Sequence, residues 1–241
     1  MNIIKASYEI MDDINAEEIY KKIERAGRTC YKSEDKITEA SAEKFVRGLI
    51  KRGHEAMLEH ASMSVKFIVD RGISHEMVRH RIASFAQEST RYCNYSYDKF
   101  GKEITVIAPC FFNDISAERK KEIMDYIDGL IDDLSTECTN RERAFGEWYL
   151  SCEHSEIAYF AMLANGCTPE EARGVLPTDL KTEVVITANM REWRHILNLR
   201  AAGTTGKPHP KMVEIMISLL KELQEKLPAL FDDIQIKEES A

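Results

Sequence analysis

The chain has 241 residues, and its 33 lysines and arginines against 41 aspartates and glutamates give a formal net charge of −8 at pH 7. This length suits one large domain or two small ones, and it is enough for a substantial core. The negative charge argues against a protein that coats nucleic acid, because such proteins are normally basic. The longest apolar run, at positions 157–164, has 8 residues, where about 20 are needed to cross a membrane. With no signal-peptide pattern at its start, the sequence favours a cytoplasmic enzyme.

Six cysteines are scattered along the chain, and none of them forms a Cys-x-x-Cys pair: Cys30, Cys93, Cys110, Cys138, Cys152 and Cys167. A disulfide framework is typical of short secreted chains, and a zinc site needs closely spaced ligands. We therefore expect six reduced thiols, most of them in the core.

The first half of the chain contains two helical patterns followed by strand patterns. Apolar residues recur at helical spacing over residues 16–26 and 39–51, and every second residue is apolar over residues 61–69. Ser74 is placed to cap a helix that runs into Arg79. The β-branched run at residues 103–108 predicts a second strand.

Residues 116–148 carry a single apolar stripe at helical spacing. Between positions 114 and 147 there are ten acidic and five basic residues, a net charge of −5. We interpret this excess as a solvated helix face. Residues 157–164 are apolar all round and predict a buried helix.

The remaining elements have clear start signals. Residues 168–171 form a capping box with proline at the first helical position, which begins a short helix carrying Arg173. A β-branched strand is expected at residues 182–188, and Asn189 is placed to cap a helix over residues 190–199.

An amphipathic helix over residues 210–227 is the last element that the sequence predicts. Helices and strands do not alternate regularly enough for a doubly wound sheet. We therefore predict an α+β fold with a mainly antiparallel sheet flanked by helices. Because there is no repeat or Pro/Gly-rich linker, we expect a single domain over residues 1–241.

The densest polar cluster, residues 79–92, holds three arginines, a histidine, two serines and a threonine. Arginine forks and hydroxyls are the donors that phosphate groups need. Arg79 and Arg81 are two residues apart and would point in different directions on a helix, so they could serve two ligands or two ends of one. The alternative is that these arginines lie on the surface and pair with Glu76 and Glu88.

A second polar cluster comprises Asn189, Arg191, Arg194, His195, Asn198 and Arg200. Arg191 and His195 are one turn apart and share a helix face. Spacing alone leaves two interpretations open, a ligand site and an exposed basic helix.

His54 and His60 superficially resemble the zinc-protease pair, but histidines six positions apart do not share a helix face, so we predict no metal site. Neither the Rossmann nor the P-loop glycine pattern is present. Any bound phosphate would therefore rest on arginines and hydroxyls.

The order Arg79-His80-Arg81, seven residues, then Ser89 resembles the R-H-R-x7-S signature of flavin-dependent thymidylate synthases. Further segments similar to that family keep the same order over about residues 50–200: Gly53-His54-Glu55, Glu59-His60, Arg91-Tyr92, Ala172-Arg173-Gly174-Val175-Leu176-Pro177, Asn189-Met190-Arg191 and Asn198-Leu199-Arg200.

The resemblance implies a homotetramer that binds FAD and converts dUMP to dTMP, with active sites assembled from several subunits. Methylenetetrahydrofolate would give the carbon and NADPH the reducing equivalents. Reduced flavin would be the hydride source, without an enzyme cysteine as nucleophile.

The resemblance also implies the site residues. The cofactor-binding residues would be His54, Glu59, Arg79, His80, Arg81, Gln87, Asn189, Arg191 and His195. The substrate-binding residues would be Glu76, Arg79, Gln87, Glu88, Ser89, Thr90, Arg91 and Arg200, with Arg173 from a neighbouring subunit. Arg200 would be catalytic, because an always-charged guanidinium facing the uracil can stabilise negative charge on the pyrimidine.

Three positions depart from the family pattern: Ala86 stands where asparagine is common, Glu88 where an apolar residue is common, and Glu76 where glutamine often contacts the nucleotide. Two alternatives stay open. One is a family member that binds flavin and nucleotide but has lost methylation. The other is a nucleic-acid-binding module in which Tyr92, Tyr95 and Tyr97 form a stacking strip.

Overall fold

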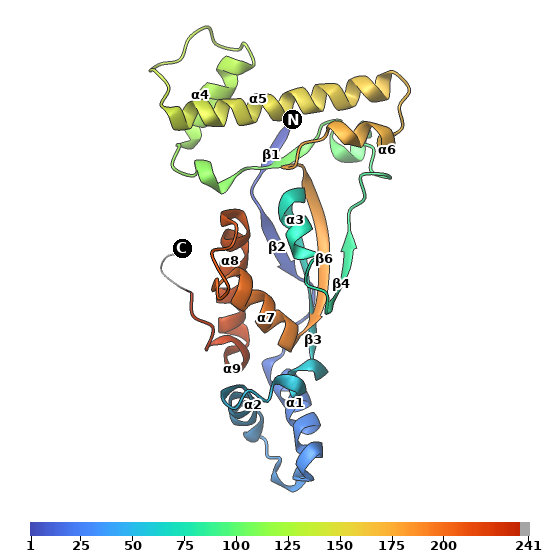
Figure 1. Cartoon of the computed structure of the whole chain (residues 1–241), viewed down its shortest axis with the longest axis vertical. Coiled ribbons are helices and arrows are strands. Elements are labelled where there is room, and N and C mark those ends of the chain that lie inside the picture. The colour runs from blue at the N-terminus through green and yellow to red at the C-terminus, as the bar shows by residue number, and fades with distance from the viewer. Residues whose placement is uncertain (237–241) are drawn as a thin grey trace. The chain divides into compact units, whose positions relative to one another are not determined.

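A computed structural model describes residues 1–236 of the chain (Figure 1). The strands are β1 (Asn2–Ile4), β2 (Ser7–Ile10), β3 (Ser62–Asp70), β4 (Ala83–Gln87), β5 (Thr105–Ile107) and β6 (Lys181–Asn189). The α-helices are α1 (Ala16–Tyr31), α2 (Ser41–Lys51), α3 (Arg71–Met77), α4 (Ala117–Ile127), α5 (Asn140–Ala164), α6 (Pro169–Ala172), α7 (Met190–Arg200), α8 (Pro210–Lys226) and α9 (Pro228–Phe231). Short 3₁₀ turns include η2 (Glu55–His60) and η5 (Arg173–Val175).

The chain divides into two compact units. Unit 1 comprises Met1–Ala6, Ile68–Ser74 and Gln87–Glu183, and unit 2 comprises Ser7–Phe67, His75–Ala86 and Val184–Ala241. Strands β3, β4 and β6 each contain residues of both units. Because the units share these strands, we keep the single domain over residues 1–241 as a proposal.

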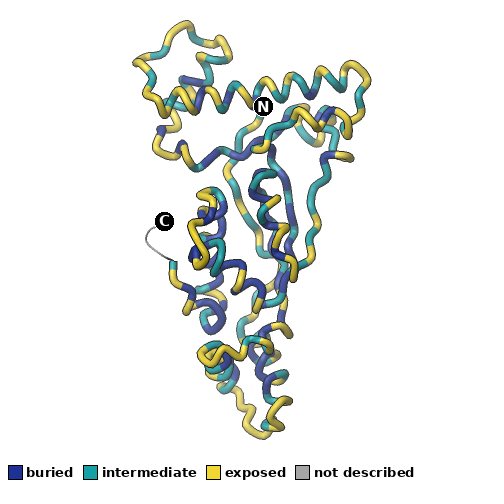
Figure 2. Tube along the Cα trace, in the orientation of Figure 1, coloured by how far each residue is buried: buried dark blue, intermediate teal, exposed yellow. Residues whose placement is uncertain are grey.

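The main sheet has the strand order β2-β3-β6-β4. The N–H of Arg71 donates to Leu180 O at 3.1 Å and that of Met190 donates to Ala61 O at 2.8 Å, which makes β3 and β6 antiparallel. Every second residue of β6 is buried, and β3 shows the same alternation over most of its length (Figure 2). The predicted α+β fold with an antiparallel sheet is confirmed, and so are the strands expected at residues 61–69 and 182–188.

A second, two-stranded sheet pairs β1 with β5 in parallel. It contains the strand expected at residues 103–108, whereas β1, β2 and β4 were not predicted. These three strands are only 3, 4 and 5 residues long, and none of them contains a buried residue. Strands this short, without a buried residue, give too few apolar positions to be recognised from the sequence.

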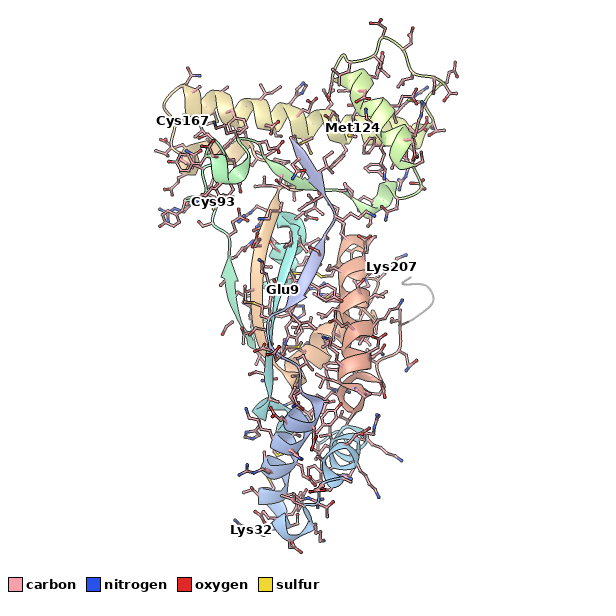
Figure 3. The ribbon with its side chains drawn as sticks, turned by 180° about the vertical axis from the view of Figure 1, so that it is seen from behind. Glu9, Lys32, Cys93, Met124, Cys167 and Lys207 are labelled. Atoms are coloured by element: carbon pink, nitrogen blue, oxygen red, sulfur yellow. The ribbon has the colours of Figure 1, made fainter. Side chains whose placement is uncertain are left out.

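Helices α1 and α2 of unit 2 confirm the helical patterns at residues 16–26 and 39–51. Helix α1 continues to Tyr31, and Lys32, labelled in Figure 3, follows as its C-cap. The φ of Lys32 is 47°, in the left-handed region. Gly27 permits a close approach of the two helices, since a Cβ built there would lie 2.6 Å from Cε1 of Phe45 on α2.

The later helices of unit 2 also follow their sequence patterns. Asn189 caps α7, and its side chain accepts a hydrogen bond from Glu192 N as expected. Helix α8 confirms the amphipathic pattern, with its predicted apolar residues fully buried. Trp193 of α7 is also fully buried, and its Nε1 donates to Met63 O of β3 at 2.9 Å.

The single helical pattern predicted for residues 116–148 is wrong, because α4 ends at Ile127 and α5 begins at Asn140. Gly129 takes a left-handed φ of 71°, its N–H donates to Tyr126 O, and the N–H of Leu130 donates to Asp125 O. These bonds make a Schellman motif, which ends a helix. Leu130, expected on the apolar stripe, is consequently 71 % exposed.

Three other expectations need correction. Residues 157–164 belong to α5 and are not buried all round, since Ile157 is 63 % exposed on one face of that helix. Helix α3 begins at Arg71, before Ser74, because Asp70 Oδ1 accepts from Ile73 N at 2.8 Å and caps the helix earlier. Within the described residues the six cysteines form no disulfide; Cys152 is buried, the half-buried Cys93, Cys138 and Cys167 pack against core clusters, and Cys30 is exposed, so fewer thiols than expected are fully buried.

No helix within residues 1–236 combines the length and apolarity needed to cross a membrane.

The capping box of α5 gives a stability prediction. Thr139 Oγ1 accepts from Glu142 N at 3.2 Å, and Glu142 Oε2 accepts from Thr139 N at 2.8 Å. Thr139→Ala removes one of these bonds, so we expect the free energy of unfolding to fall by about 1 kcal/mol in urea denaturation. Thr139→Ser keeps the hydroxyl and should stay close to wild type. Equal stability of the alanine and serine variants would contradict this role of the cap.

Candidate active site

The predicted site residues are distributed over both units. Unit 2 holds His54, Glu59, Glu76, Arg79, His80, Arg81, Asn189, Arg191, His195 and Arg200. Unit 1 holds Gln87, Glu88, Ser89, Thr90, Arg91 and Arg173.

A pocket of about 420 Å³ lies in unit 2, within the size range of small-molecule sites. Four predicted cofactor-binding residues line it: Glu59, Asn189, Arg191 and His195. The remaining lining residues, Glu55, Ile82, Glu192, Arg194 and Asn198, were not among the predicted site residues. Two of these, Arg194 and Asn198, could have been found from the second polar cluster in the sequence.

The junction between β6 and α7 brings this pocket together. Strand β6 ends at Asn189, which caps a helix that begins at the next residue, so no loop separates the two elements. Arg191 and His195, one turn apart on α7, are both exposed and both line the pocket, as their spacing predicted.

The basic side chains of α7 differ in their partners. Arg191 Nη1 donates to Glu59 Oε1 at 2.6 Å. Arg194 is only 5 % exposed; its Nη1 donates to Asp233 Oδ1 at 2.7 Å, and its Nε lies 3.4 Å from Glu55 Oε1. Although burial opposes the effect, these bonds from Arg194 hold the pKa of the Asp233 carboxyl below its usual range. Arg194 is therefore not part of an exposed basic face, whereas Arg191 and His195 are exposed, as both interpretations of this cluster allow.

Arg79 and Arg81 are exposed and form no ion pair within the described residues. The acids proposed as their surface partners are engaged elsewhere: Glu76 Oε2 accepts from Arg200 Nη1 at 3.0 Å, and Glu88 Oε2 accepts from Lys181 Nζ at 3.1 Å. Both arginines are thus free to bind an anion. His54 is also exposed, but it does not line the pocket.

His80 is the buried centre of a polar cluster in unit 2. Its Nε2 accepts a hydrogen bond from Arg200 Nε at 3.2 Å, and its Nδ1 lies 3.8 Å from Glu192 Oε1. Its ring contacts that of His195 edge-on, with centroids 6.3 Å apart. Burial, with the positive charges of Arg200 and His195, lowers the pKa of His80 to about 4. His80 is consequently neutral at pH 7, as an acceptor of an arginine N–H must be.

Apart from Arg173, the predicted substrate residues of unit 1 begin at Gln87, the last residue of β4, and continue directly after it. Gln87 Nε2 donates to Ser74 Oγ at 2.8 Å and to Thr182 Oγ1 at 3.3 Å, so its side chain is held inside the unit. Glu88, one of the family departures, has its charge neutralised by Lys181. Its carbonyl oxygen accepts from Arg71 Nη1 at 3.3 Å. These bonds fix the backbone that leads into the turn beginning at Ser89.

That turn carries hydroxyls and arginines. Thr90 is 8 % exposed, and Ser89 Oγ accepts from Arg91 N at 3.3 Å. The Arg91 guanidinium lies 2.8 Å from Glu170, with both side chains about half exposed. Arg173, at the start of η5, is exposed and forms no ion pair within residues 1–236.

The tyrosine stacking strip is not formed. Tyr95 is only 4 % exposed, and its ring packs edge-on against Phe100 and Tyr159, at centroid distances of 5.2 and 5.6 Å. Tyr92 and Tyr97 are exposed, but the burial of Tyr95 between them in sequence interrupts the proposed strip. In the described part of the chain, no group of three or more His, Cys, Asp or Glu side chains is placed to hold a metal ion.

Comparison with known proteins gives a consistent result. Residues 14–229 match the family described as "thymidylate synthase complementing protein" (Thy1). A flavin-dependent thymidylate synthase of Corynebacterium aurimucosum is 31 % identical over 229 residues, covering 93 % of this chain and 83 % of the relative. A flavin-dependent thymidylate synthase of Mycobacterium tuberculosis is 30 % identical over 219 residues, covering 89 % and 79 %.

A solved structure has the same fold. It is the UMP/dUMP methylase PolB from Streptomyces cacaoi, bound with 5-Br dUMP, and it matches with a TM-score of 0.72 at 20 % identity, covering 96 % of each chain. The chain therefore belongs to the flavin-dependent thymidylate synthase family. It is a flavin-dependent methyltransferase of thymidylate synthesis.

The low pKa of His80 predicts a specific loss of stability in acid. Above pH 6.5 the side chain is neutral in both the folded and the unfolded chain. Between pH 6.5 and 4 the unfolded chain binds a proton that folded His80 rejects, so acidification destabilises the folded state, by up to about 3 kcal/mol from this group. His80→Gln should lose less stability than wild type between pH 7 and 4.5 in urea denaturation. The same loss in both proteins would show that His80 is not the group concerned.

Proposed function

We propose that the protein converts dUMP to dTMP, with FAD as cofactor, methylenetetrahydrofolate as carbon donor and NADPH as reductant. The observation that carries this proposal is that the signature residues Arg79 and Arg81 are exposed and have no ion pair within the described residues. The acids nearest them in sequence, Glu76 and Glu88, are neutralised by Arg200 and Lys181. A free pair of guanidinium groups suits a diphosphate ligand.

The residues present fit FAD. Arg79 and Arg81 would hold its phosphates, and Asn189, Arg191 and His195 would contribute from their pocket of about 420 Å³. His54, Glu59, His80 and Gln87 would complete the cofactor set. When bound and reduced, the flavin supplies a hydride to the pyrimidine. The proposed mechanism uses no enzyme cysteine as nucleophile.

Unit 1 would hold the phosphate and sugar of dUMP. Ser89 and Thr90 offer hydroxyls, and the backbone from Gln87 onward is fixed by the bonds of Gln87 and Glu88. Arg91 would exchange Glu170 for the phosphate, because ion pairs as exposed as this one contribute about 1 kcal/mol or less. Arg173 of a neighbouring subunit would add a second guanidinium, in a cytoplasmic homotetramer.

Arg200 would face the uracil ring. Its permanent positive charge stabilises negative charge that develops on the pyrimidine, so that C5 and C6 become reactive towards the electrophile and the hydride. Glu76 would lie at the same end of the nucleotide.

Flavin loading tests the cofactor assignment. We expect the purified protein to be yellow and to be bleached by dithionite. Arg79→Ala and Arg81→Ala should each weaken FAD binding by about 10-fold or more in a fluorescence titration, because each removes a charge-assisted contact. Arg143→Ala is the matched control, since Arg143 on α5 is likewise exposed and without an ion pair in the described structure. Equal weakening by all three variants would contradict a specific diphosphate site.

The role of Arg200 is tested by product formation. Arg200→Ala should keep its flavin but form dTMP at least about 100-fold more slowly than wild type, because it lacks the stabilising charge. dTMP is quantified chromatographically beside dUMP-dependent NADPH oxidation. Wild-type turnover by this variant would refute the assignment. If the wild-type protein oxidises NADPH with dUMP and forms no dTMP, it is instead a member that has lost methylation, as the departures at Ala86, Glu88 and Glu76 allow.

A further inference from the structure

We propose that Glu76 is a positioning residue for Arg200: with His80 it holds the guanidinium in one orientation and leaves the Nη2 side for the substrate. This inference rests on the proposed function, in which Arg200 faces the uracil ring. It gives Glu76 a task different from direct contact with the nucleotide.

The two bonds engage different nitrogens of one planar group. Arg200 Nε donates to His80 Nε2 at 3.2 Å, and Nη1 donates to Glu76 Oε2 at 3.0 Å. Together they fix both the plane and the rotation of the guanidinium. Of its five N–H groups, both on Nη2 are without a partner in the described residues. The Arg200 side chain is 22 % exposed, so part of it is accessible to a ligand.

Both acceptors come from a single rigid turn. The N–H of Arg79 donates to Glu76 O at 3.3 Å, and that of His80 donates to Met77 O at 3.2 Å. Met77 is 1 % exposed and anchors this turn in the core. Arg200 is the last residue of α7, whose Ile196 and Leu197 are buried. The bonds from Arg200 to Glu76 and His80 therefore join two fixed elements, as a preorganised site requires.

A purely stabilising role does not account for the Glu76 pair. The side chains of Glu76 and Arg200 are 35 % and 22 % exposed, and pairs this accessible contribute about 1 kcal/mol or less to stability. An unpaired acid would also repel a phosphorylated substrate. Pairing with Arg200 neutralises the carboxylate and so removes that repulsion. The glutamate at position 76, where the family often has glutamine, then orients the catalytic arginine.

The experiment compares Glu76→Ala with Glu76→Gln, since only glutamine keeps an oxygen that can accept from Nη1. For Glu76→Ala we expect kcat for dTMP formation to fall about 10- to 100-fold. The Kd for dUMP should change less than about threefold, because the lost interaction orients Arg200 and does not hold the nucleotide. Glu76→Gln should recover most of kcat. Glu43→Ala, which breaks the exposed Arg47–Glu43 pair on α2, is the control and should leave kcat unchanged.

A second measurement is independent of turnover. The Arg200 Nη1–H resonances, assigned by their loss in Arg200→Lys, should exchange slowly with water in wild type and in Glu76→Gln, and rapidly in Glu76→Ala, because Nη1 is the nitrogen that donates to residue 76. If Glu76→Ala leaves both kcat and these resonances unchanged, or if glutamine behaves like alanine, the positioning role is wrong. If wild type forms no dTMP, the proposed function fails, and the exchange measurement alone decides the orientation of Arg200.

Discussion

The direct passage of strand β6 into helix α7 places three of the nine candidate cofactor residues, Asn189, Arg191 and His195, together with Arg200. Alternate residues of β6 are buried along its whole length, and the fully buried Trp193 ties α7 back to β3 through Met63. The helix therefore cannot rotate about its own axis without exposing its apolar side. Arg191 and His195 are held towards the pocket, and Arg200 is held at the far end of the helix, as consequences of that packing.

The electrostatics of the chain distinguish arginines that are already satisfied from arginines that are available. Arg194 is enclosed by Asp233, Glu55 and the carbonyl of Leu230, and it serves the fold. Arg79, Arg81 and Arg173 have no ion pair in the described structure and serve a ligand in our proposal. The net charge of −8 hides this distinction, since the excess acid of the whole chain outweighs these three arginines in the sum.

Elements with strong local signals could be predicted from the sequence, whereas choices made by tertiary contacts could not. The capping box at Thr168 and the cap at Asn189 set their helix starts through bonds to residues only three positions away. Strand β4, in contrast, has no buried residue and owes its place to pairing with β6. The partner of Glu76 was equally hidden, because Arg200 lies 124 positions away and Arg79 only three. Nothing in the local sequence says which arginine folds back onto that acid.

The contact between α1 and α2 has a consequence for how this sequence can diverge. Gly27 accommodates the ring of Phe45, and a Cβ at that position would fall 2.6 Å from it, closer than carbon atoms can approach. A relative with alanine at the equivalent of Gly27 needs a smaller residue opposite, or a wider separation of the two helices. Substitutions at positions 27 and 45 should therefore be coupled during evolution.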